Sequence, residues 1–172
     1  PYLSHKTADA PVLAMSDDGV NIVPLLGGHH GGLRIAKALA SENDSHIAVT
    51  MAGNIAWSAS LDEPPQGWRL ANPDRAAPVM ASLLAGTGAK RDGEAQASLD
   101  AWPAEVPPRD DVVLTATMQA LAPANNQLVY CPQQLVLGVG CARGCAVEEL
   151  MPHVLAHLDA HNLNPSAIAA VV

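Results

Sequence analysis

The stretch "VPLLGGHHGG", Val23 to Gly32, places two histidines among four glycines directly after an apolar run. Apolar residues recur with helical spacing from Leu33 to Leu39, and "HIAVT", His46–Thr50, has the composition of a buried strand. Strand, glycine turn, helix and strand in this order predict a βαβ unit with parallel strands. The glycine turn then lies at the carboxyl end of a strand, where open α/β sheets bind ligands.

Working outward from the turn, the preceding residues predict a β-hairpin. Val12–Met15 and Val20–Leu26 are two β-type runs, and Asp17-Asp18-Gly19 between them is a tight-turn signal. On the other side of the turn the sequence is less regular. Ser60–Pro78 is expected to be a loop or irregular excursion, Ala76–Leu84 a helix, and Ala85–Ala95 a linker or flexible loop.

The last third predicts a second βαβ unit. Asp111–Met118 and Gln134–Cys141 are predicted strands, the second of them buried. An amphipathic helix follows over Val147–Leu158, and Ala167–Val172 is expected to be the next strand. The predicted fold class is therefore α/β, with mostly parallel sheets and glycine-rich turns between strand and helix.

Composition limits the classes of function. The chain of 172 residues is 49% hydrophobic, enough for a core, and its formal net charge of -8 argues against nucleic acid or an anionic membrane as partner. No run approaches the roughly 18–20 apolar residues of a membrane span, and no signal peptide is visible, so a cytoplasmic location is expected. The three cysteines lack zinc spacing, which predicts reduced thiols and no structural metal.

The histidines of "GGHHGG" are candidates for chemistry. An imidazole near neutral pH can act as a general base or donate a hydrogen bond, and glycine lets backbone amides approach a ligand closely. The alternative is a structural turn in which one histidine caps the backbone and the other faces solvent. The spacing is neither the dinucleotide fingerprint nor a P-loop. Thr50 and Asn54 follow the next strand and are expected at the same edge of the sheet.

A second glycine pattern, "GVGCARGC", occupies Gly138–Cys145. Arg143 could hold a carboxylate there, whereas Cys141 and Cys145 are interpreted as structural thiols. His153, His157 and His161 repeat every four residues, but they lie off the apolar face of the predicted helix and are interpreted as a solvated face.

Two of these stretches resemble a known family. "DDGVNIVPLLGGHHGGLRIAKALA" resembles the N-terminal domain of the CbiG family of cobalamin biosynthesis, and "LVLGVGCARGCAVEEL" is similar to the start of its C-terminal domain, which also occurs alone as CobE. Two positions depart from the family. Asn54 stands where the family more often has Asp, and Leu33-Arg34 stands where it often has Ala-Asn.

The resemblance implies two small α/β domains, the second truncated. Residues 1–85 would be the CbiG N-terminal-like domain, residues 86–133 a Pro-rich middle region and linker, and residues 134–172 the start of the C-terminal domain. The family's activity is hydrolytic opening of the δ-lactone of cobalt-precorrin 5A, with release of acetaldehyde. No cofactor is implied, because cobalt enters only as part of the substrate.

The resemblance also implies roles for residues. His29 and His30 would be catalytic, and the substrate-binding set would be Gly27, Gly28, Gly31, Gly32, Thr50, Asn54, Gly138, Gly140 and Arg143. The implied partner is a cobalt-corrin or precorrin intermediate, and a homodimer is left open. The alternative function is a non-catalytic corrinoid-binding module, associated with or fused to a precorrin methyltransferase.

Overall fold

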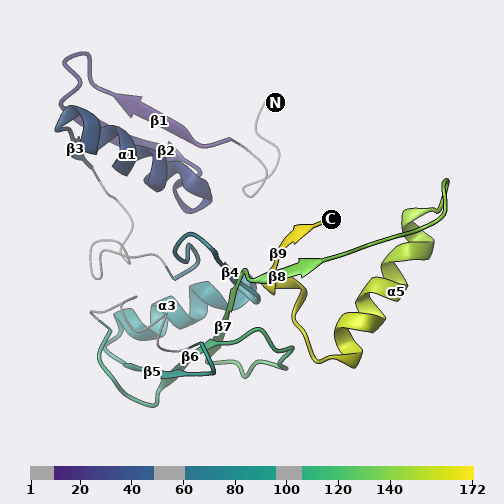
Figure 1. Cartoon of the computed structure of the whole chain (residues 1–172). Coiled ribbons are helices and arrows are strands. Elements are labelled where there is room, and N and C mark those ends of the chain that lie inside the picture. Colours follow the sequence, from purple (N-terminus) through teal and green to yellow (C-terminus); the bar gives the residue numbers. More distant parts are fainter. Residues whose placement is uncertain (1–9, 49–60, 96–105) are drawn as a thin grey trace. The chain divides into compact units, whose positions relative to one another are not determined.

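The computed structural model describes residues 10–48, 61–95 and 106–172 (Figure 1). Its backbone contacts divide the chain into two compact units, Pro1–Glu63 and Pro64–Val172. Each unit is described by itself below. Both combine helices with sheets, so the predicted α/β class is confirmed.

The N-terminal unit begins with the predicted hairpin. Strands β1 (Val12–Met15) and β2 (Asn21–Leu26) pair antiparallel. Between them, one carboxylate oxygen of Asp18 accepts hydrogen bonds from the Ser16 hydroxyl at 2.6 Å and from the Val20 amide at 3.0 Å. These two hydrogen bonds hold the pKa of Asp18 below its usual value, and the one from the Ser16 hydroxyl contributes most. The turn is therefore closed by a charged acceptor.

The predicted βαβ unit follows the hairpin. A π-helical turn, η1 (Gly28–Gly32), leads without a break into α1 (Leu33–Asn43), and β3 (His46–Ile47) then pairs parallel with β2. The sheet order is β1-β2-β3. The apolar core of this unit comes from the strand, the helix and the segment after residue 60, and its fully or nearly fully buried side chains are Ile22, Leu33, Ala36 and Leu61.

The C-terminal unit is built around a four-stranded sheet of order β4-β7-β6-β5 (Figure 1). Its strands are β4 (Trp68–Leu70), β5 (Ala89–Asp92), β6 (Val112–Ala116) and β7 (Gln127–Pro132). Strands β5, β6 and β7 are parallel neighbours, and β4 pairs antiparallel with β7. The strand expected near residues 111–118 is therefore confirmed as β6.

Two sequence-based expectations are wrong in this region. Strand β4 lies inside Ser60–Pro78, which was expected to be irregular, and β5 lies inside Ala85–Ala95, which was expected to be a linker. Residues 86–133, taken as a middle region and linker, contain three of the four strands of the sheet. The sequence of β5 is Ala-Lys-Arg-Asp, which has no alternation of apolar and polar residues. The segment becomes a strand only because it pairs with β6.

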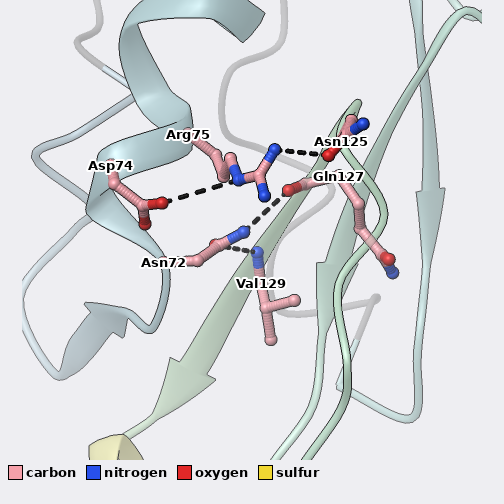
Figure 2. Close-up of polar contacts among 6 residues, drawn as sticks. All are labelled: Asn72, Asp74, Arg75, Asn125, Gln127 and Val129. Carbon is pink, nitrogen blue, oxygen red and sulfur yellow. Dashed lines mark hydrogen bonds and ion pairs between the residues drawn. The ribbon is translucent and has the colours of Figure 1, made fainter.

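A buried asparagine ties the helical layer to the sheet. The 3-10 turn η2 (Pro73–Arg75) leads into α3 (Ala76–Leu84), the helix predicted from the sequence. Just before it, Asn72 donates to the Gln127 carbonyl at 2.8 Å and accepts from the Val129 amide at 2.9 Å (Figure 2). Asn72 is only 8% exposed, so water has little access to its side-chain amide. The amide nitrogen and oxygen are hydrogen-bonded to the backbone of β7 in place of water.

The C-terminal part forms the second predicted βαβ unit. Strand β8 (Leu135–Leu137) leads to α5 (Val147–Ala160), and the 3-10 turn η3 (Pro165–Ala167) leads to β9 (Ile168–Val171), which is parallel to β8. The expected strand over Gln134–Cys141 is shorter than predicted and is not buried: Val136 is 64% exposed. Within the described residues, β8 has a single strand neighbour and no layer covers this residue.

Helix α5 shows the predicted amphipathic spacing, but its apolar face is largely uncovered. Leu158 is buried at 5% exposure, whereas Val147, Met151 and Leu155 are 66%, 44% and 48% exposed. In Figure 1 the helix stands apart from the four-stranded sheet of the same unit. Among the described residues, no helix is both long and apolar enough to cross a membrane.

We expect Asn72→Ala to lower the free energy of unfolding of the C-terminal unit by roughly 2–4 kcal/mol, because each buried group left without a partner costs about 1–3 kcal/mol. The matched control is Arg75→Ala, which removes a solvent-accessible hydrogen bond to Asn125 and an ion pair with Asp74 (Figure 2). That change should cost less than about 1 kcal/mol. Urea unfolding followed by circular dichroism compares the two, and equal losses would contradict the role of Asn72.

Candidate functional site

The glycine turn lies at the carboxyl end of β2, as predicted. Strands β2 and β3 run parallel, with Asn21 opposite His46 and Ile22 opposite Ile47, so both carboxyl ends meet the same edge of the sheet. The backbone of this turn has a form that the sequence did not predict. A π-helical turn already begins at Gly28, five residues before the predicted start of the helix at Leu33, and Gly31 within it has a φ of +88°. Single π-helical turns are rare and occur frequently at functional sites.

Two of the glycines are required by close packing. Gly27 has a φ of +64°, in the left-handed region, and a Cβ there would lie 2.9 Å from Pro11 Cα. Gly32 has ordinary helical angles, but a Cβ would lie 2.8 Å from the Gly27 carbonyl oxygen. That same oxygen accepts the Gly32 amide at 3.0 Å. At Gly27 and Gly32 the turn is too tight for any side chain. Close packing therefore accounts for two of the four glycines in this stretch without a ligand.

One amide of the turn already binds a carboxylate. The Gly31 amide donates to Glu63 Oε1 at 3.1 Å in a part-buried contact between residues 32 apart in sequence. The Arg34 guanidinium lies near Gly31, because a Cβ built on Gly31 would be 3.8 Å from its Nη2 atom. Sequence patterns did not predict a role for Glu63. Its only local signal is an acidic residue before Pro64-Pro65, which says nothing about a partner so far away.

The described residues bring only part of the predicted set together. Gly27, Gly28, Gly31 and Gly32 share the turn with the backbone of His29 and His30, whose side-chain positions lie outside the description. Thr50 and Asn54 also lie outside the described residues. Their grouping with the histidines stays a prediction, supported by the parallel pairing of β2 and β3.

The second predicted glycine turn follows β8 in the other unit. Gly138, Gly140 and Arg143 are all exposed, and a Cβ on either of these glycines would meet nothing within 4 Å. Their glycine character is therefore not required by local packing. Because Gly27–Gly32 and Gly138–Arg143 belong to different compact units, each turn is considered on its own.

The cysteines and the histidine row show no sign of a metal centre. Cys131, Cys141 and Cys145 are free thiols. His153 and His157 are exposed on α5, as predicted, and His161 is exposed directly after its end. The rings of His157 and His161 meet edge to face, with their centroids 4.6 Å apart. Across residues 10–48, 61–95 and 106–172, no group of three or more His, Cys, Asp or Glu side chains is arranged to hold a metal ion.

Strand, π-helical glycine turn and helix define an α/β protein whose candidate site lies at the carboxyl edge of a parallel strand pair. Comparison with known proteins then shows which family this chain resembles. Residues 1–54 match the family described as Cobalamin synthesis G N-terminal. Together with the curated relative described next, this match confirms the resemblance to the CbiG family predicted from the sequence.

A curated relative is the cobalt-precorrin-5A hydrolase of Priestia megaterium, which is 24% identical over an alignment 176 residues long. The alignment covers 87% of this chain and 46% of that protein. Among solved structures, a cobalamin biosynthesis protein G homologue from Sulfolobus solfataricus is 19% identical, with a TM-score of 0.34. That match covers 99% of this chain and 52% of the other. The chain thus spans about half the length of each of these relatives.

We expect Gly32→Ala to destabilise the N-terminal unit even though its backbone angles are helical. Alanine should gain up to about 1 kcal/mol from helix propensity, but the new Cβ must displace the Gly27 carbonyl, and such overpacking costs roughly 1–3 kcal/mol. Gly138→Ala, which meets open space, is the control and should leave stability unchanged. Thermal unfolding of both variants tests this, and a Gly32→Ala protein as stable as the control would refute it.

The thiols should differ sharply in reactivity. Burial, with a smaller contribution from the nearby Glu94 carboxylate, raises the pKa of the Cys131 thiol to about 11. Cys141 is exposed, so at pH 8 it should react with Ellman's reagent while Cys131 stays protected until the chain unfolds. A Cys141→Ser variant should lose the fast phase of the reaction and Cys131→Ser should keep it. The opposite pattern would contradict the burial of Cys131.

Proposed function

We propose that this chain opens the δ-lactone of a cobalt-precorrin 5A-type corrin intermediate and releases a two-carbon fragment as acetaldehyde. The observation that carries the proposal is the glycine turn at the carboxyl edge of β2 and β3, within the segment that matches the Cobalamin synthesis G N-terminal family. The Priestia megaterium relative, named a cobalt-precorrin-5A hydrolase, supports the same reaction class.

The chemistry of the turn suits lactone hydrolysis. Water must be activated to add to the lactone carbonyl, and the negative charge that develops on the carbonyl oxygen must be stabilised. The first amides of a helix lack partners within the helix, and they lie at its positive end. In this proposal the amides of the turn other than those of Gly31 and Gly32, which already donate to Glu63 and to the Gly27 carbonyl, receive the oxyanion. His29, which matches the family's histidine most directly, is the base, with His30 as second choice.

The remaining predicted residues keep supporting roles in the proposal. Thr50 and Asn54 would line the same cleft as the turn, and Asn54, lacking a carboxylate, would orient substrate and not take a proton. Gly138, Gly140 and Arg143 would bind a carboxylate arm of a corrin in the second unit. The protein would need no cofactor of its own, since cobalt belongs to the substrate.

Incubation of the purified chain with the lactone intermediate tests the proposal, with acetaldehyde measured by an alcohol dehydrogenase that oxidises NADH. If His29 is the base, His29→Ala should lower turnover by roughly 10²–10⁴-fold while the circular dichroism spectrum stays unchanged. His30→Ala is the matched control and should lose less.

One outcome would contradict the proposed activity, and another the proposed role of the glycine turn. Binding of the intermediate without any acetaldehyde would favour the alternative, a non-catalytic corrinoid-binding module that works beside a precorrin methyltransferase. Acetaldehyde release at the normal rate from a His29→Ala, His30→Ala double variant would remove the glycine turn from the mechanism.

A further inference from the structure

Two thiols meet in the turn between β8 and α5 (Figure 1). Cys141 is exposed and Cys145 is half-buried, so neither packs into the core as a structural thiol would. The side chain of Cys145 lies within hydrogen-bonding distance of the side chains of Cys141 and Glu149. The third cysteine of the chain, Cys131, is fully buried in β7. The turn therefore brings two of the three cysteines together where solvent reaches them.

A hydrogen-bonded β-turn sets this arrangement. The Cys145 amide donates to the Ala142 carbonyl at 3.1 Å, and Gly144 has a φ of +85°, as the third residue of a type II turn requires. Cys141 immediately precedes the turn and Cys145 is its last residue. Because the turn reverses the chain between them, the two sulfurs are close before any bond joins them.

We propose that Cys141 and Cys145 form a dithiol site that reduces small-molecule disulfides and is itself closed to an intramolecular disulfide. The Cys141 thiolate attacks one sulfur of the small disulfide and releases one thiol, which takes up the proton that Cys141 lost. The Cys145 thiolate then attacks the Cys141 sulfur and releases the second thiol, which takes up the proton of Cys145. Two protein thiols are thus oxidised to one disulfide, and the small disulfide is reduced to two thiols.

The surroundings of the two sulfurs set the order of attack. Cys141 is the more exposed thiol, and the attacking sulfur must reach the disulfide. Burial, then the neighbouring Cys141 and the Glu149 carboxylate raise the pKa of the Cys145 thiol, which keeps it protonated while Cys141 reacts. Once Cys141 is part of a mixed disulfide, it carries no charge that opposes ionisation of Cys145. Cys145 is therefore the thiol that resolves the mixed disulfide.

The disulfide would change the second glycine turn. Arg143 lies between the two cysteines, and the bond would close a ring over residues 141–145 that includes it. Arg143 is the residue proposed to bind a carboxylate arm, so oxidation would fix the backbone that carries it. The dithiol site itself does not depend on the proposed reaction, because thiol–disulfide exchange needs no corrin.

Glutathione disulfide, with mass spectrometry of the whole chain, tests the site. The unchanged chain should lose two hydrogen atoms and retain no glutathione. Cys145→Ser should keep one glutathione on Cys141, because the resolving thiol is missing, and Cys141→Ser should react slowly. Cys131→Ser is the control and should behave like the unchanged chain. A stable mixed disulfide on the unchanged chain, or a protein disulfide that includes Cys131, would overturn the proposal.

A pair of glycine variants tests the contribution of the turn. A Cβ on Gly144 or on Gly138 would meet no atom within 4 Å, but of the two only Gly144 has a positive φ. Gly144→Ala should lower the equilibrium constant for ring closure in glutathione redox buffers roughly 5–30-fold, because residues other than glycine are disfavoured in the left-handed region. Gly138→Ala should leave this constant unchanged.

Equal equilibrium constants for the two glycine variants would contradict the role of the turn. Ring closure in the unchanged chain should also be several-fold less favourable in urea, where the turn is lost. A constant that is the same in the folded and the unfolded chain would show that nearness in sequence alone joins the cysteines, and it would overturn the site.

Discussion

The backbone contact between Gly27 and Gly32 is the constraint on which the N-terminal unit depends. The carbonyl of Gly27 accepts the Gly32 amide, and this contact leaves no room for a side chain at Gly32. The chain can therefore leave β2 and enter a helix within six residues. That reversal carries Leu33 and Ala36 back over the sheet, where they are buried together with Ile22. Packing of the core and placement of the histidines in the turn follow from the same contact.

Sequence patterns predicted the elements whose residues carry local signals. The Asp-Asp-Gly hairpin, helix α1, strand β6 and the amphipathic helix α5 all have such signals, and each is present. Strand β4 was missed because Trp-Arg-Leu is only three residues long, and β5 because Ala-Lys-Arg-Asp lacks alternation. Both become strands only by pairing with β7 and β6. Propensity is a weak guide where a distant neighbour decides the conformation.

The same distinction applies to the candidate site. The position of the glycine turn at the carboxyl edge of a parallel pair could be predicted, because strand, turn and helix are consecutive in sequence. The hydrogen bond from Gly31 to Glu63 could not, because no local rule links residues 32 apart. It places a carboxylate against a backbone amide in a chain whose net charge is -8, because a backbone amide acts at short range.

The open βαβ unit at the C-terminal end has a consequence for how this polypeptide behaves in solution. The exposed apolar side chains of α5 lie in the same unit as Val136 and Val171, each 64% exposed on a two-stranded parallel sheet. Exposed apolar surface of this kind favours association between molecules of the chain. Electrostatic repulsion between these molecules, which carry the same negative net charge, opposes that association. That repulsion acts over about 10 Å at 0.1 M salt and about 3 Å at 1 M salt. The colloidal stability of the chain should therefore fall as salt is added, so dilute, low-salt buffers are those in which its molecules stay apart.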